Sequence, residues 1–251
     1  MIWTQWSDLK IPNGLTHLPT DGVTPRQEDL SKITFYVPAY MFGAAALVPI
    51  AKMSSLKVIQ SPNAGVDDVI ALRPAGVTLC NAAGVHDAST AELAVGLAIA
   101  ARRGFAQFAK DQSAGKWSHT TYASLTDSKV AIVGHGNIGK TIAGMLAGFE
   151  VEITSFSKSG SDGAVKMDKF DALLPTFDVI ILIVPLNSET RHLINANRLA
   201  AMKYGAALIN VARGAVVDTD ALLKELQTGR ISAGLDVTDP EPLPSGHPLW
   251  S

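Results

Sequence analysis

The sequence is poor in cysteine and in charged residues. Cys80 is the only cysteine among 251 residues, so no disulfide can form within the chain, and we expect a reducing compartment. Charged residues make up 18% of the chain and hydrophobic residues 47%, which suits an α/β protein with buried strands. The formal net charge of −2 gives no electrostatic reason to bind nucleic acid or an anionic membrane.

Long apolar runs are also missing. Stretches such as residues 93–101 are too short to span a bilayer, which takes about 20 apolar residues in a helix. The N-terminal segment MIWTQWSDLK lacks the basic start and apolar centre of a signal peptide. We therefore expect a soluble, cytoplasmic protein.

The clearest motif present is KVAIVGHGNIG at residues 129–139. An apolar stretch typical of a buried parallel strand precedes the glycines, and a helical pattern follows them. Gly134 permits a tight turn, Gly136 lets the backbone approach a pyrophosphate, and Gly139 lets helix and strand pack closely. Phosphates would bind the free amides at the start of the helix. With a second strand at 151–156, this predicts Rossmann dinucleotide binding rather than a plain glycine-rich turn.

Strand-like and helical segments alternate along the chain, as in α/β proteins. The expected strands are 34–37, 56–60, 77–80, 130–133, 151–156, 178–184, 206–211 and 231–236. The expected helices are 39–53, 67–72, 91–102, 140–146, 195–201 and 219–228, with an irregular segment at 104–122. We predict a doubly wound parallel sheet of the Rossmann type at 84–251 and a second, smaller α/β domain at 1–83.

A short block in the first domain, NAGVD at 63–67, follows directly on an expected strand. Open α/β sheets place ligand-binding loops at the carboxyl ends of their strands, so Gly65 could belong to a binding loop. A plain turn is the alternative explanation for this glycine. No glycine fingerprint occurs in the first domain, so we expect the cofactor to bind the second one.

Four blocks together resemble a known family. They are NAGVD (63–67), VGHGNIG (133–139), NVARGAVVD (210–218) and GLDVTDPEPLPSGHPLW (234–250). In this order they resemble the D-isomer-specific 2-hydroxyacid dehydrogenases over nearly the whole chain. The resemblance implies two Rossmann- or flavodoxin-like domains with the active site in their cleft, a homodimer, and reduction of small 2-keto acids by NADH or NADPH, or the reverse oxidation. Another Rossmann enzyme, such as an alanine dehydrogenase, would not explain NVARG followed by DPEP.

The resemblance implies two catalytic residues. Arg213 of NVARG matches the substrate-binding arginine, and a guanidinium can both bind a carboxylate through two hydrogen bonds and stabilise charge on the adjacent keto oxygen. An arginine that caps a strand end is the alternative. Glu241 of DPEP matches the acidic partner that keeps a catalytic histidine protonated near neutral pH. Without the resemblance, Glu241 would be an ordinary surface glutamate.

The resemblance also implies the binding residues, while no metal site is expected. Ala64, Gly65 and Val66 match the loop whose backbone amides hold the substrate carboxylate, together with Arg213. The residues expected to contact the cofactor are Thr90, Gly134, Gly136, Asn137, Ile138, Gly139, Ser157, Lys158, Ser159, Val184, Pro185, Val211, Ala212 and Asp236.

The pattern departs from the family at the proton donor. The family's catalytic histidine stands in a proline–histidine motif beyond HPLW, followed by a C-terminal helix, and neither occurs in these 251 residues. The six histidines are His17, His86, His119, His135, His192 and His247. His247 of HPLW is the one candidate for a replacement acid. We therefore expect impaired turnover, and the alternatives are a non-catalytic NAD(P)H-binding protein or a fragment of a longer enzyme.

The residues after the second Rossmann strand predict the cofactor. An acidic residue about 20 positions past the glycine loop usually binds the ribose 2′-hydroxyl of NAD. Here the sequence reads Ser157-Lys158-Ser159, which supplies one positive charge, two hydroxyls and no carboxylate. We therefore expect NADP to be preferred, with NAD also accepted. A solvated loop lysine is the alternative.

The segment 104–122 carries four aromatic residues, Phe105, Phe108, Trp117 and Tyr122. This is more aromatic surface than a lone loop should leave exposed, so we expect it to contact a second copy of the chain.

Overall fold

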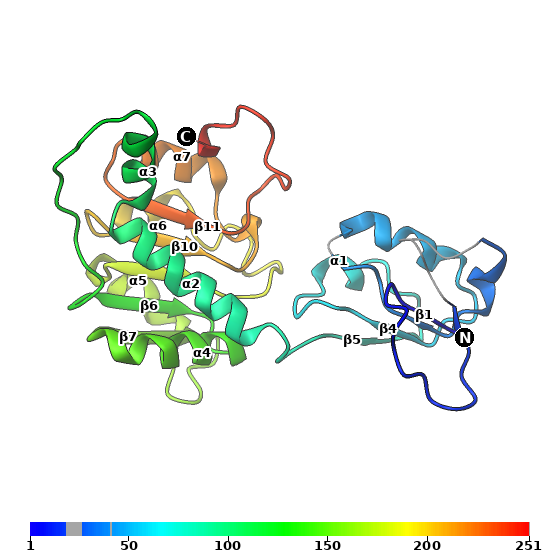
Figure 1. Cartoon of the computed structure of the whole chain (residues 1–251). Coiled ribbons are helices and arrows are strands. Elements are labelled where there is room, and N and C mark those ends of the chain that lie inside the picture. The colour runs from blue at the N-terminus through cyan, green and yellow to red at the C-terminus, as the bar shows by residue number, and fades with distance from the viewer. Residues whose placement is uncertain (19–26, 41, 251) are drawn as a thin grey trace. The chain divides into compact units, whose positions relative to one another are not determined.

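The structure, a computed structural model, describes residues 1–18, 27–40 and 42–250. The chain divides into two compact units, Met1–His86 and Asp87–Ser251 (Figure 1). Each unit has its own parallel sheet and its own hydrophobic core. No helix in the described ranges is long and apolar enough to cross a membrane.

In the described residues of the first unit, five short parallel strands form a sheet in the order β2-β1-β3-β4-β5. The strands are β1 Ile2–Trp3, β2 His17–Leu18, β3 Phe35–Tyr36, β4 Val58–Gln60 and β5 Thr78–Cys80. The order 2-1-3-4-5 is that of flavodoxin-like sheets. The rings of Trp3 and Tyr36 contact each other in a tilted arrangement, with their centroids 4.9 Å apart, inside a core that also includes Ile33 and Ile59.

The helices of the first unit are short. They are η1 Gln27–Lys32, η2 Gly43–Ala46, η3 Val48–Lys52 and α1 Asp67–Ile70. The predicted single helix at 39–53 is therefore wrong, since two 3₁₀ segments replace it; residue 41 lies outside the described residues. Gly43 has φ +52° and Pro49 lacks an amide hydrogen, and both features oppose a continuous α-helix.

The second unit is built on a six-stranded parallel sheet in the order β11-β10-β9-β6-β7-β8. The strands are β6 Lys129–Val133, β7 Glu152–Ser157, β8 Val165–Lys166, β9 Val179–Leu182, β10 Ala207–Asn210 and β11 Ser232–Leu235. Counted from β6, this is the 3-2-1-4-5-6 order of a Rossmann sheet. The chain reverses its direction of winding between β6 and β9, which is where such sheets bind their ligands.

Helices cover both faces of this sheet. The helices are α2 Asp87–Arg102, α3 Phe105–Ser113, α4 Asn137–Leu146, α5 Phe170–Leu173, α6 Ala196–Ala201 and α7 Thr219–Gln227, with short turns η4 Ala147–Phe149, η5 Met167–Lys169, η6 Leu174–Thr176, η7 Gly214–Val216 and η8 Pro248–Trp250. Val130 and Ile132 pack with α2 and α4, whereas Ala131 and Val133 pack with α5, α6 and α7. The central strands are mostly apolar because both faces are buried, and their polar positions are Lys129 at the start of β6 and Asn210 at the end of β10.

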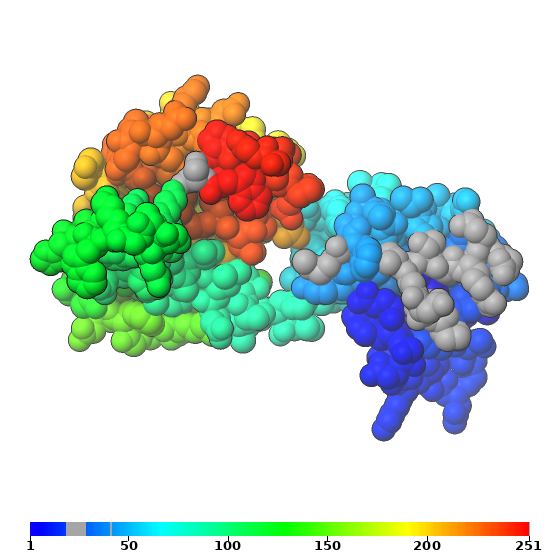
Figure 2. Space-filling view, turned by 45° about the horizontal axis from the view of Figure 1, so that its top comes forward, coloured from blue at the N-terminus to red at the C-terminus, as the bar shows by residue number. Residues whose placement is uncertain are grey.

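The segment predicted to be irregular, 104–122, contains α3, so this prediction is wrong for its first half. Of the residues in α3 only Asp111 is buried, which is why apolar periodicity does not reveal the helix. Phe108 meets Tyr122 edge to face at 5.3 Å, and a Cβ on Gly104 would lie 2.3 Å from the Tyr122 ring. We call residues 105–122 the arm; it lies on the outer surface of the second unit (green in Figure 2).

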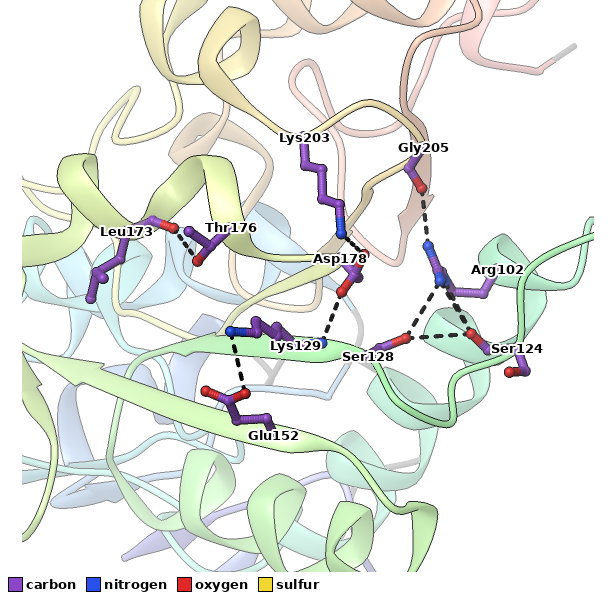
Figure 3. A network of polar contacts seen from close by, with 10 residues as sticks. All are labelled: Arg102, Ser124, Ser128, Lys129, Glu152, Leu173, Thr176, Asp178, Lys203 and Gly205. Carbon is purple, nitrogen blue, oxygen red and sulfur yellow. Dashed lines mark hydrogen bonds and ion pairs between the residues drawn. The ribbon is translucent and has the colours of Figure 1, made fainter.

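A polar network joins the amino ends of the central strands (Figure 3). Asp178 accepts hydrogen bonds from the Lys129 amide at 2.9 Å and from Lys203 Nζ at 2.7 Å. Arg102, at the end of α2, donates to the carbonyl oxygens of Gly205 and Ser124. Burial raises the pKa of Asp178, but the hydrogen bonds from Lys203 and Lys129 and the nearby cations outweigh it, and the pKa lies below its usual value. These contacts at the amino ends of the strands are structural. The loops described next follow the carboxyl ends of the same strands.

Candidate functional site

The glycine loop after β6 has two positions where no side chain fits. Gly134 has φ +122°, and a Cβ there would lie 2.2 Å from the carbonyl oxygen of Ile183. A Cβ on Gly139 would lie 2.1 Å from the carbonyl oxygen of Gly134. Both glycines therefore allow backbone segments of the loop, α4 and the chain after β9 to touch.

Gly136 differs from the other two glycines. It precedes α4, is exposed, has φ −80°, and a Cβ there would meet no heavy atom within 4 Å. The amides of Asn137, Ile138 and Gly139 form the first turn of α4, where no side chain caps the helix. Open space and unpaired amides at a helix start fit a pyrophosphate, because the helix dipole favours negative charge there.

The residues after β7 form an ordered turn at the same edge. Ser157 Oγ accepts a hydrogen bond from the Gly160 amide at 3.0 Å, and Ser159 Oγ lies 2.8 Å from Ser161 Oγ. Lys158 Nζ pairs with the carboxylate of Glu189 at 2.6 Å. The expectation that no carboxylate lies near Lys158 is therefore wrong, because the chain after β9 supplies one.

The glycine loop is also tied to the turn that follows β7. His135 Nε2 donates to the carbonyl oxygen of Asp162 at 3.0 Å, and Lys140 Nζ lies 3.3 Å from Asp162 Oδ2. Asp162 adopts φ +57°, which an aspartate tolerates better than most residues. The sequence motifs gave no sign of this contact, because position 162 lies in none of them.

The NVARG and DPEP blocks touch through their backbones. A Cβ on Gly214 would lie 1.9 Å from the carbonyl oxygen of Thr238, so only glycine fits there. Thr219 Oγ1 donates to the carbonyl oxygen of Asp239 at 2.9 Å. The residues 213–214 and 238–239 are thus held together, and Glu241 follows two residues after this contact on the segment that leaves β11.

Arg213 itself is half-buried. Its Nη1 donates to the Ala212 carbonyl oxygen at 2.8 Å, and Asn210 Nδ2 donates to the Arg213 carbonyl oxygen at 2.9 Å. Asn210 is fully buried, and its Oδ1 accepts from the Ala212 amide at 3.1 Å. Glu241 and Asp236 are exposed. Asn210 was not among the predicted site residues, and its hydrogen bonds hold the turn that carries Arg213.

The remaining predicted cofactor residues lie on other loops of this edge. Val184 and Pro185 follow β9, and the buried residues Val211 and Ala212 follow β10. Thr90 lies in the first turn of α2 and is half-buried. Because Arg102 ends α2 at the amino edge of the sheet, the start of α2 lies toward the carboxyl edge.

In the first unit, three hydrogen bonds hold the loop after β4 by its carbonyl oxygens. His86 Nε2 donates to Pro62 at 3.1 Å, Asn81 Nδ2 donates to Ala64 at 2.9 Å, and the Ala82 amide donates to Asn63 at 3.0 Å. In the described part of the chain, the amides of residues 64–66 have no acceptor. A loop with its carbonyls engaged and its amides free can bind an anion. Sequence reasoning missed His86 and Asn81.

A pocket opens beside this loop, with a volume of about 540 Å³. It is lined by Val66, Ile70, Arg73, Leu79, Cys80 and Asn81. Within the described residues, no three His, Cys, Asp or Glu side chains are placed to hold a metal ion.

Residues 95–251 match the family described as "D-isomer specific 2-hydroxyacid dehydrogenase, NAD binding domain". The chain belongs to this family. As a 2-hydroxyacid dehydrogenase homologue, it is 37% identical over 210 residues to the glyoxylate reductase of Thermofilum pendens, covering 78% of this chain and 62% of that protein. The chain spans 62% to 68% of the lengths of three curated relatives that it matches.

Solved structures of the family share the fold. One is a D-isomer specific 2-hydroxyacid dehydrogenase family protein from Aeromonas salmonicida, with a TM-score of 0.84, 30% identity, and coverage of 96% of this chain and 79% of that one. Another is the D-isomer specific 2-hydroxyacid dehydrogenase of Xanthobacter autotrophicus Py2 in complex with NADPH and MES, with a TM-score of 0.76, 27% identity, and coverage of 100% and 84%. The predicted family and the two α/β folds are thereby confirmed.

Proposed function

We propose that this chain is an NAD(P)-dependent oxidoreductase that transfers a hydride between the nicotinamide cofactor and a small 2-keto or D-2-hydroxy acid. The observation that carries the proposal is the glycine loop. Backbone atoms leave no room for a side chain at Gly134 and Gly139, while Gly136 faces open space. The cofactor, when bound, supplies the hydride. The predicted residues around this loop orient it through backbone amides and the first turn of α4.

Arg213 is proposed to bind the substrate and to stabilise the charge that develops on its keto oxygen. A guanidinium stays protonated at any working pH, so it can hold the carboxylate in two hydrogen bonds but cannot donate a proton. Replacing Arg213 with Lys keeps the charge and removes the two-pronged geometry. We expect NADPH affinity to be unchanged by this replacement and keto acid reduction to fall by about tenfold or more.

The first unit is proposed to be the substrate-binding domain, in which the amides of Ala64, Gly65 and Val66 donate hydrogen bonds to the substrate carboxylate. The predicted boundary at 83/84 lies close to the division of the structure after His86. Calorimetric titration with oxalate, a dicarboxylate without a reducible carbonyl, tests the loop directly. Asn81→Ala removes the hydrogen bond to the Ala64 carbonyl oxygen and should weaken oxalate binding while leaving NADPH binding intact.

NADP is proposed as the preferred cofactor. Lys158, with the hydroxyl of Ser159 beside it, offers charge and hydrogen-bond donors to a 2′-phosphate, and the NADPH complex of the Xanthobacter relative is consistent with this choice. Fluorescence titration should give a lower Kd for NADPH than for NADH, and Lys158→Ala should abolish the difference. Equal affinities that do not respond to Lys158→Ala would contradict the preference.

Turnover by residues 1–251 is proposed to be slow. Reduction of a ketone leaves an alkoxide, and a positioned general acid is typically worth about 10²–10⁴ in rate. None of the six histidines stands in the family's proline–histidine motif, and Glu241 is exposed. Steady-state assays with glyoxylate, hydroxypyruvate, pyruvate and phosphohydroxypyruvate test this. Fast turnover that is lost in His247→Gln would contradict it and identify His247 as the acid.

The second candidate function is NAD(P)H binding without catalysis. It rests on the glycine loop alone, which could bind a dinucleotide without a proton donor. Measurable cofactor affinity with no turnover on any of the four keto acids would select it. A protein that binds neither NADPH nor NADH would exclude both candidates.

A further inference from the structure

The loops after β7 and β9 carry an ion pair that the proposed hydride transfer does not need. Lys158 Nζ lies 2.6 Å from Oε2 and 2.7 Å from Oε1 of Glu189. The Lys158 side chain is 82% exposed and the Glu189 side chain 61%, so a dissolved ligand can reach both charges. Since β6 lies between β7 and β9, the pair joins the two segments that flank the glycine loop.

The backbone around Glu189 is held in a defined turn. Asn187 Oδ1 accepts hydrogen bonds from the amides of Glu189 at 2.9 Å and Thr190 at 3.1 Å. Thr190 Oγ1 donates to the carbonyl oxygen of Pro185 at 2.6 Å. The backbone at Glu189 is therefore held in place, while the exposed side chain can still rotate in solvent.

In a Rossmann sheet, a carboxylate at the end of the second strand accepts a hydrogen bond from the ribose 2′-hydroxyl of NAD. Here β7 ends at Ser157 and is followed by Lys158, and the carboxylate comes from the opposite side of β6. We propose that Glu189 is a specificity-determining residue that sets the ratio of NADPH affinity to NADH affinity. Its carboxylate accepts a hydrogen bond from the 2′-hydroxyl of NADH. Its ion pair with Lys158 must break when the 2′-phosphate of NADPH binds.

This inference rests on the proposed cofactor site and adds a residue to it. A 2′-phosphate carries about −1.5 to −2 charge at neutral pH, so it is attracted by Lys158 and repelled by Glu189. Because both side chains are exposed, water and salt screen these interactions, and the effect of one charge is modest. We expect Glu189→Gln to lower the Kd for NADPH by about three- to tenfold. The Kd for NADH should stay the same or rise.

The experiment measures the Kd values of NADPH and NADH by nicotinamide fluorescence at low and high salt. The variants are Glu189→Gln, Glu189→Ala and the matched control Glu152→Gln. Glu152 also forms an exposed pair with a lysine, Lys129 at 3.4 Å, but at the amino end of β7. Calorimetry with 2′,5′-ADP and 5′-AMP repeats the comparison on the adenosine half alone.

The expected result is a higher NADPH/NADH affinity ratio in both Glu189 variants, with the gain reduced at high salt and absent in Glu152→Gln. An unchanged ratio in Glu189→Gln and Glu189→Ala, with cofactor still bound, would overturn the role of Glu189 and leave the proposed function standing. A gain of the same size in Glu152→Gln would overturn it as well, because the effect would then be one of net charge. Failure of every form to bind either cofactor would overturn the proposed function, and this inference with it.

Discussion

At the scale of single residues, Gly134 and Gly136 of the loop after β6 lead to opposite predictions for stability and binding. Gly134→Ala places a Cβ 2.2 Å from a carbonyl oxygen at φ +122°, and should lower the free energy of unfolding by about 3 kcal/mol. Gly136→Ala adds a methyl group to open space at φ −80°, and should change it by less than about 1 kcal/mol.

The same pair separates structure from cofactor binding. Gly136→Ala should raise the Kd for NADPH by about tenfold or more, equivalent to about 1.4 kcal/mol, because the methyl group occupies the space beside the free amides. Urea denaturation and fluorescence titration of both variants measure the two effects. A Gly136→Ala protein that is stable and binds NADPH normally would show that the pyrophosphate does not lie against this loop.

At the scale of elements, the Asp178 network predicts how the second unit responds to acid. Asp178→Asn weakens the hydrogen bonds to Lys203 and to the Lys129 amide, and should lower the free energy of unfolding by about 1–2 kcal/mol at neutral pH. The folded-state pKa is lowered, so this contribution is present above the unfolded value of about 3.9 and is lost as the pH falls through the folded pKa.

The measurement is urea denaturation of wild type and Asp178→Asn at a series of pH values. The two should differ at pH 7 and converge in acid. Asp168→Asn is the matched control, because Asp168 pairs with Lys166 at 3.4 Å and both side chains are exposed. A difference between wild type and Asp178→Asn that persists unchanged at low pH would contradict the ionic origin of the effect.

Five of the six strands of the second unit could be predicted from the sequence to within two residues at each end, because an apolar run such as Val179–Leu182 leaves little freedom for a buried parallel strand. The two-residue edge strand β8 was not predicted. α3 could not, since its apolar side chains Phe105 and Phe108 face outward and give no core-directed period. The place of Arg213 in its motif was clear from the sequence. The carboxylate of Glu189 was not, because it reaches Lys158 from 31 residues further along the chain.

At the scale of the whole molecule, the arm predicts a homodimer. Trp117 is 95% exposed and Phe105 55% exposed, and both belong to the arm. Burial of such side chains against a second copy would remove apolar area from water. Light scattering should show a dimer at micromolar concentration, shifted toward monomer by Trp117→Ser. Phe42→Ser, which removes an exposed aromatic residue of the first unit, should leave the mass unchanged. A monomeric wild-type protein would contradict the prediction.

The two cores predict the course of thermal unfolding. The core cluster of the first unit contains no residue beyond Leu79, and those of the second contain none before Ala91. Units with separate cores unfold as separate cooperative transitions. Calorimetry should show two endotherms, and NADPH should raise the temperature of only one, since a ligand stabilises the unit that binds it. A single transition that shifts with NADPH would contradict this.

The polar network and the glycine loop lie at opposite ends of the same strands, about 15 Å apart for a strand of five residues. Side chains that fasten the sheet at one end are therefore out of contact with those that face a ligand at the other. Directed evolution can then vary the loops at the ligand end while the network residues Arg102, Asp178 and Lys203 stay unchanged. A library randomised at residues 157–159 and 187–189 should retain a large share of folded members, whereas one randomised at 102, 178 and 203 should not.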